Sequence, residues 1–138
     1  MKRVLFDAHV VLDVLLDRQP FVGESAAAWA AVETGRAEGI LAAHSFTTIY
    51  YLLQKRSGSA SAKRVFSAIL KAFGVASVDA PVMLAALRLP FSDFEDAVTA
   101  AAAQSAGCEY VVTRDPKGFR HSPFPPLTPE AALRLSAR

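Results

Sequence analysis

The sequence has a single cysteine, Cys108, and no apolar run near the length of a membrane span. One cysteine excludes a disulfide framework, so we expect a reducing, cytoplasmic setting. A span needs about 18–20 consecutive apolar residues, so we expect no membrane insertion. Positive and negative side chains are also nearly balanced, because the net charge is only +2 over 138 residues. This balance permits an anionic partner but does not indicate one.

Two further absences narrow the function. No glycine-rich loop follows any apolar run, which argues against a nucleotide-binding or phosphatase-like domain. No acidic residue occurs between Glu38 and Asp79, so this stretch supplies no carboxylate to a site. The hydrophobic fraction of 52% and the charged fraction of 20% are typical of one folded domain, which we place over residues 1–138.

Short apolar runs alternate with helical patterns along the chain. Buried strands are predicted at 4–6, 39–43, 75–78 and 110–112, with an extended segment near 123–127. Helices are predicted after Asp7 and at 22–34, 46–55, 62–73, from 80 and 92–106, with a short one from Pro129. We expect Ser45 to cap the third helix, Thr128 to cap the last, and 57–61 to be a flexible joint. The alternation predicts a three-layer α/β/α domain with a parallel sheet of four or five strands.

Carboxylates gather where strands end or helices begin. Asp7 follows the first strand, Asp93 and Asp96 open the alanine-rich helix, and Asp115 follows the fourth strand. Each has a structural alternative: Asp7 and Asp93 suit helix caps, and Asp115 suits the first position of a type I turn. Parallel strands bring their carboxyl ends to one edge, so the acids together favour a Mg²⁺ or Mn²⁺ site.

Three segments carry a resemblance to a known family. They are residues 5–13 (Leu-Phe-Asp-Ala-His-Val-Val-Leu-Asp), 93–97 (Asp-Phe-Glu-Asp-Ala) and 110–119 (Tyr-Val-Val-Thr-Arg-Asp-Pro-Lys-Gly-Phe), in that order. The chain resembles the PIN-domain family, which includes the VapC-type ribonuclease toxins, over nearly its full length. The resemblance implies metal-dependent endonucleolytic cleavage of RNA. It also implies a small antitoxin protein that covers the active site, and a homodimer.

The resemblance assigns roles to particular residues. It implies that Asp7, Asp96 and Asp115 are catalytic and hold the metal, with Asp93 as a further candidate ligand and Thr113 as a supporting hydroxyl. Three positions depart from the family's pattern. Thr48 stands where a Glu is usual, His9 where an Asn is common, and Gly118 precedes Phe119 where Asp-Phe is common. Thr48 could still supply a hydroxyl or hold a water, which would bind the cation more weakly.

Other residues have a functional and a structural interpretation. Arg114, Lys117 and Arg120 suit contacts with RNA phosphates or a solvated turn, and His9 suits a proton shuttle, an extra ligand or a surface position. Tyr50, Tyr51 and Trp29 suit base stacking, but their spacing favours the core or a dimer interface. We interpret His44 and His121 as structural, and Cys108 as a small buried residue without chemistry.

The leading hypothesis is therefore a VapC-like, Mg²⁺- or Mn²⁺-dependent endoribonuclease. The alternative is a PIN domain that has lost catalysis and binds RNA or a protein. Thr48 and Gly118 favour this alternative, because both occupy positions where the resemblance leads us to expect an acid.

Overall fold

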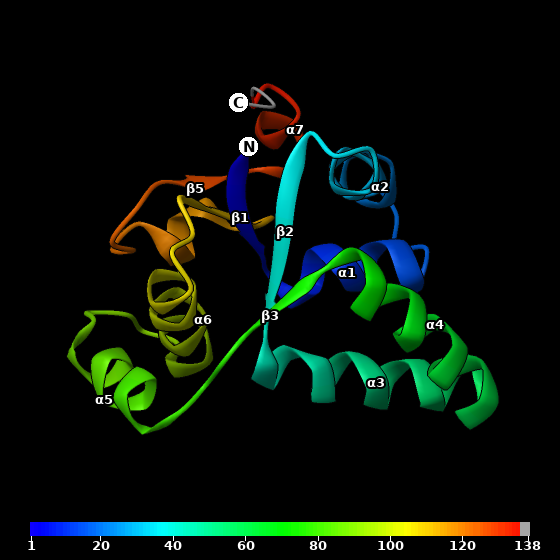
Figure 1. The fold of residues 1–138 in the computed structure, drawn as a ribbon, viewed down its shortest axis with the longest axis horizontal. Helices are drawn as coiled ribbons and strands as arrows, with labels where there is room; N and C mark the ends of the chain where they lie inside the picture. The colour runs from blue at the N-terminus through cyan, green and yellow to red at the C-terminus, as the bar shows by residue number, and fades with distance from the viewer. Residues whose placement is uncertain (136–138) are drawn as a thin grey trace.

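The computed structural model describes residues 1–135, which form α-helices on both faces of a parallel sheet (Figure 1). The strand order is β3-β2-β1-β4-β5. The strands are β1 (Lys2–Phe6), β2 (Ala37–Ala42), β3 (Gly74–Ala76), β4 (Tyr110–Val112) and β5 (Pro126–Leu127). All paired strands run parallel. The predicted α/β/α class with four or five strands is confirmed.

The helices divide between the two faces of the sheet. One face is covered by α1 (Ala8–Leu15), α2 (Val22–Glu33), α3 (Ala43–Ser57) and α4 (Ser59–Ala72), with α7 (Pro129–Ala132) against α2. The other face is covered by α5 (Ala80–Arg88) and α6 (Phe94–Ser105). A short 3-10 helix, η1 (Pro116–Phe119), follows β4 and packs with α6 on that second face.

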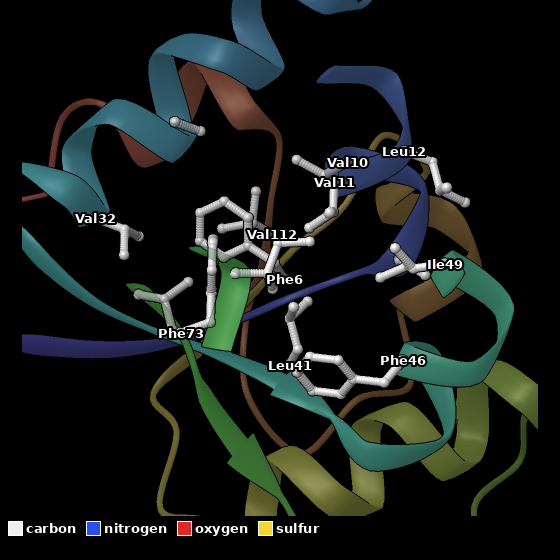
Figure 2. Close-up of a cluster of buried hydrophobic side chains, with 14 of the residues drawn as sticks. Phe6, Val10, Val11, Leu12, Val32, Leu41, Phe46, Ile49, Phe73 and Val112 are labelled. Carbon is white, nitrogen blue, oxygen red and sulfur yellow. The ribbon is translucent and has the colours of Figure 1, made fainter. Parts of the chain in front are cut away.

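Side chains of β1 alternate between two apolar cores, which fixes the strand in the middle of the domain. Val4 and Phe6 pack with α1–α4, whereas Leu5 packs with α5 and α6. Phe6 lies in the larger core, and its ring meets Phe73 edge-on with centroids 5.2 Å apart (Figure 2). All three β1 side chains are essentially without solvent exposure, as expected for a central strand of a doubly covered sheet.

The topology places a crevice at the carboxyl ends of β1 and β4. The chain builds outward from β1 through β2 to β3, then returns to add β4 on the other side of β1. Ligands of open α/β sheets bind where the strand order reverses in this way. Asp7 follows β1 and Thr113 follows β4, so both predicted site segments lie at this switch point.

Two local predictions were wrong. Ser45 does not cap α3: the helix begins at Ala43, and Ser45 is buried within its first turn. The predicted flexible joint at 57–61 is a break of one residue, because α3 ends at Ser57 and α4 begins at Ser59. Gly58 makes this tight turn with a φ of +85°, a conformation that favours glycine. The last helix begins at Pro129 with Thr128 as its cap, as predicted.

Candidate active site

Asp7 occupies the N-cap position of α1, but its side chain makes no capping hydrogen bond. Its backbone N–H donates to the carbonyl of Val112 at 2.9 Å, which continues the β1–β4 pairing by one residue. Its Oδ2 accepts a hydrogen bond from the hydroxyl of Thr113 at 3.2 Å. The carboxylate is therefore tied across the strand ends to the residue that follows β4.

Thr113 connects two of the predicted acids. Its side chain is fully buried. The hydroxyl donates to Asp7 and accepts the backbone N–H of Asp115 at 3.0 Å. The single hydroxyl thus fixes the orientation of Asp7 and the start of the loop that carries Asp115. Its role in supporting a metal site stays a prediction.

Asp93 and Asp115 both act as caps. Oδ1 of Asp93 accepts the N–H of Asp96 at 3.1 Å, and Oδ1 of Asp115 accepts the N–H of Gly118 at 3.3 Å. The structural alternatives for these two residues are therefore correct. Each bond uses one carboxylate oxygen, and the second oxygen of each group remains available to a ligand.

The acids share one region of negative potential. The pKa of Asp96 is raised from 3.8 to about 7, first by burial and then by the charges of Asp7, Asp93, Glu95 and Asp115. Burial also raises the pKa of Asp7, against the lowering effects of His9 and the Thr113 hydroxyl. Like charges held together in this way are relieved by a cation.

Gly118 lies beside carboxylate oxygens of both Asp96 and Asp115. A Cβ atom at Gly118 would lie 2.7 Å from Oδ2 of Asp115 and 3.7 Å from Oδ2 of Asp96. The absence of a side chain at Gly118 therefore lets Oδ2 of Asp115 approach the backbone closely, on the side where Oδ2 of Asp96 also lies.

The residues present fit a hydrated hard cation. All the candidate donors are oxygens, which Mg²⁺ and Mn²⁺ prefer. Within residues 1–135, no three Asp, Glu, His or Cys side chains form a preassembled cage for a metal. Mg²⁺ does not require one, because it keeps several waters and is commonly bound through one or two carboxylates.

Asp13 and Arg114 form an ion pair that the sequence did not indicate. Asp13 is completely buried, and its Oδ2 lies 2.9 Å from Nε of Arg114. The guanidinium carbon of Arg114 lies 4.0 Å from the centroid of the Phe21 ring. An acid on the apolar side of α1 was the available signal, but its partner lies far away in the sequence.

The remaining predicted residues are spread around the site. His9 is exposed and shares a pocket of about 270 Å³ with Asp7, Phe21, Arg114 and Asp115. Lys117 and Arg120 are exposed on the turn after β4, and Arg120 donates to the carbonyl of Lys117 at 3.0 Å. Thr48 is exposed on α3. No hydrogen bond among the described residues joins Thr48 to the acids, and its predicted role stays a prediction.

The residues interpreted as structural lie mostly in packed positions. His44 is bonded through Nε2 to Thr99 of α6 at 3.2 Å, which links α3 to α6. The ring of Trp29 packs edge-on against Phe73, and the ring of Tyr50 packs edge-on against Phe66. Tyr51 and His121 are exposed instead. Cys108 is buried, and burial raises the pKa of its thiol to about 12, so the reactive thiolate is disfavoured.

No helix among residues 1–135 has the length and apolar character needed to cross a membrane.

No curated protein matches the chain. Similar folds occur in solved structures: a toxin–antitoxin complex from Klebsiella pneumoniae has 22% identity and a TM-score of 0.70, covering 91% of this chain and 97% of that one. FitAcB from Neisseria gonorrhoeae has 18% identity and a TM-score of 0.66, covering 91% and 97%.

A third structure is VapC20 of Mycobacterium tuberculosis, a toxin that cleaves the sarcin–ricin loop. It has 18% identity and a TM-score of 0.59, covering 78% of this chain and 86% of that one. At these identities the likeness concerns the fold alone. The family follows from the sequence itself, because a PIN-domain model matches residues 3–117. The chain therefore belongs to the PIN-domain family.

Proposed function

We propose that this chain is a Mg²⁺- or Mn²⁺-dependent endoribonuclease of the VapC type, with Asp7, Asp96 and Asp115 as the metal-holding acids. The observation that carries the proposal is the shared electrostatic field of these acids at the switch point of the sheet. Asp7 and Asp115 both contribute to the raised pKa of Asp96, and carboxylate oxygens of Asp96 and Asp115 both lie beside Gly118. Packing like charges together in this way costs stability unless a cation is bound.

The side chains of the site have separable tasks in phosphodiester hydrolysis. Bound there, a divalent cation would supply positive charge that polarises the phosphate and favours deprotonation of the attacking water. Thr113 holds Oδ2 of Asp7 in position, and the absence of a side chain at Gly118 lets Oδ2 of Asp115 keep its position. Lys117 and Arg120, both exposed on the adjacent turn, would attract the RNA backbone.

Two observations support RNA as the substrate class. VapC20, which is similar to this chain in fold, is a toxin that cleaves the sarcin–ricin loop. The site is also flanked by basic residues and joined to an open pocket, which suits an extended, single-stranded polyanion.

The test is an RNA cleavage assay with Mg²⁺, Mn²⁺ or excess EDTA. Wild-type protein should cleave only with metal, and Asp7→Asn should lower the rate by about a hundredfold or more, as loss of a central catalytic group does. Asp17→Asn is the matched control, because Asp17 is an exposed acid at the end of α1 and should leave cleavage unchanged. Equal cleavage by wild type and Asp7→Asn would assign the activity to a contaminant and refute the proposal.

A second function, a non-catalytic PIN domain that binds RNA or a protein, is favoured by Thr48. This residue is exposed and provides no carboxylate where the family usually has one. Retained RNA binding by a wild-type protein that cleaves with neither metal would support this alternative.

The partners follow from the same proposal. Solved relatives in fold include a toxin–antitoxin complex, and we propose a small antitoxin that covers the site of this chain as well. We also propose a homodimer, which light scattering of the purified protein would detect.

A further inference from the structure

The pocket beside the carboxylates joins three separate parts of the chain. Its volume is about 270 Å³, and its lining residues are Asp7, His9, Phe21, Arg114 and Asp115. Two of them are proposed metal-holding acids. An RNA strand with its cleaved phosphate at these acids therefore has this pocket available for the neighbouring nucleotide.

Arg114 is held in one orientation in the wall of this pocket. Its Nε faces the buried carboxylate of Asp13 at 2.9 Å, and its guanidinium carbon stacks on Phe21 at 4.0 Å. The side chain keeps 26% of its surface exposed. Because the stem and one face of the guanidinium are already fixed, little conformational entropy remains to be lost when its terminal nitrogens bind a ligand.

Arg114 is not the only partner of the Asp13 carboxylate. The hydroxyl of Ser25 also donates to Oδ2 of Asp13 at 3.2 Å, and Nη1 of Arg18 lies 3.9 Å from Oδ1. Nε of Arg114 is close to Asp13 but has no aligned hydrogen-bond partner among the described residues. A buried ion pair that serves stability alone needs good hydrogen-bond geometry to offset its desolvation.

His9 adds a second donor to the pocket. Nη1 of Arg18 lies 3.4 Å from Nδ1 of His9. Arginine only donates, so Nδ1 of His9 accepts in this contact and Nε2 is the ring nitrogen left for a ligand. His9 is exposed and lines the pocket, so Nε2 can donate to a ligand oxygen.

We propose that this pocket binds the RNA phosphate adjacent to the one that is cleaved, with Arg114 as the phosphate-binding residue and Asp13 as its positioning residue. The inference rests on the proposed ribonuclease function. A phosphate fits because the free donors are a guanidinium and an imidazole N–H. The exposed ring of Phe21 supports the guanidinium on its other side and provides the apolar edge of the subsite.

The experiment measures binding of a fluorescein-labelled, single-stranded RNA by anisotropy in EDTA, over a range of salt concentrations. Arg114→Gln should weaken binding about tenfold, as loss of a charged hydrogen bond does. It should also lower the slope of log affinity against log salt by about 0.7, the value for one phosphate contact on a single strand. Arg64→Gln removes the same charge from an exposed position on α4 and should change neither quantity.

Two further variants separate binding from folding. Asp13→Asn combined with Arg114→Gln removes both members of the ion pair, so no buried charge is left unpaired, and should show the same loss of affinity and slope. Phe21→Leu changes an exposed residue and should weaken binding a few-fold without altering the slope. The subsite is refuted if the Phe21 variant and the folded Arg114 variants bind RNA as the Arg64 control does.

The outcome is independent of the nuclease test. Binding is measured without metal, so loss of affinity in the Arg114 variants would stand even if wild-type protein cleaved no RNA. Conversely, metal-dependent cleavage with unchanged binding by these variants would support the nuclease and remove the subsite.

Discussion

The acids of this site make local hydrogen bonds and also belong to the cluster of carboxylates at the ends of β1 and β4. Asp93 and Asp115 each use one oxygen to cap a helix, whereas Asp7 stands at a cap position and bonds to Thr113. The sequence could place these acids because each lies next to a predicted strand end or helix start. It could not indicate the pair of Asp13 with Arg114, because that contact depends on how α1 packs against the loop after β4.

Asp96 makes the stability of the metal-free protein depend on pH. Its folded-state pKa of about 7 lies above the ordinary 3.8, so the folded state holds a proton that the unfolded state has lost. Stability should therefore fall as pH rises from about 4 to 7, and the penalty should be complete above that window. Asp96→Asn removes the charge, so in EDTA its urea midpoint should exceed that of wild type at pH 8 and equal it at pH 4.

The control for this prediction is Asp17→Asn, an exposed acid with no part in the carboxylate cluster. It should follow the wild-type pH profile. Added Mg²⁺ should stabilise wild type at pH 8 more than Asp96→Asn. If the stability of wild type and of Asp96→Asn changed in parallel from pH 4 to 8, the pKa of Asp96 would not be raised in the folded protein, and the prediction would fail.

At the scale of elements, the strands and most helices could be predicted, and their boundaries less well. β4 lies at the predicted residues, because its apolar run is short and bounded by turn residues. The start of α3 was missed because β2 leads into the helix directly, with no polar cap. The segment 57–61 has the composition of a linker, yet the packing of α4 on α3 leaves only Gly58 outside a helix.

A substitution in the 3-10 helix η1 tests how this element positions Asp115. Gly118→Ala should move Asp115, because the added Cβ would lie 2.7 Å from its Oδ2. We expect the melting temperature in EDTA to change little, since the backbone of Gly118 is not in the left-handed region. The increase in melting temperature produced by Mg²⁺ should be lost. Gly23→Ala is the matched control, because a Cβ there meets nothing within 4 Å. A full Mg²⁺ response in Gly118→Ala would place the cation elsewhere.

At the scale of the molecule, the strand order creates the site. The α/β/α class could be predicted from alternating strand and helix patterns, but the order β3-β2-β1-β4-β5 depends on long-range pairing that one sequence does not specify. That order makes β1 central and sets Asp7 beside the end of β4. Without the pairing of β1 with β4, Asp7 and Asp115 would not lie at neighbouring strand ends.

The central claim is that Asp7, Asp96 and Asp115 form one divalent-cation site, and Mn²⁺ soaked into crystals of the protein tests it most directly. We predict an anomalous-scattering peak between these three side chains in wild type and its loss in Asp7→Asn. Crystals of Asp17→Asn should keep the peak. A peak elsewhere, or none between these acids at saturating Mn²⁺, would contradict the account.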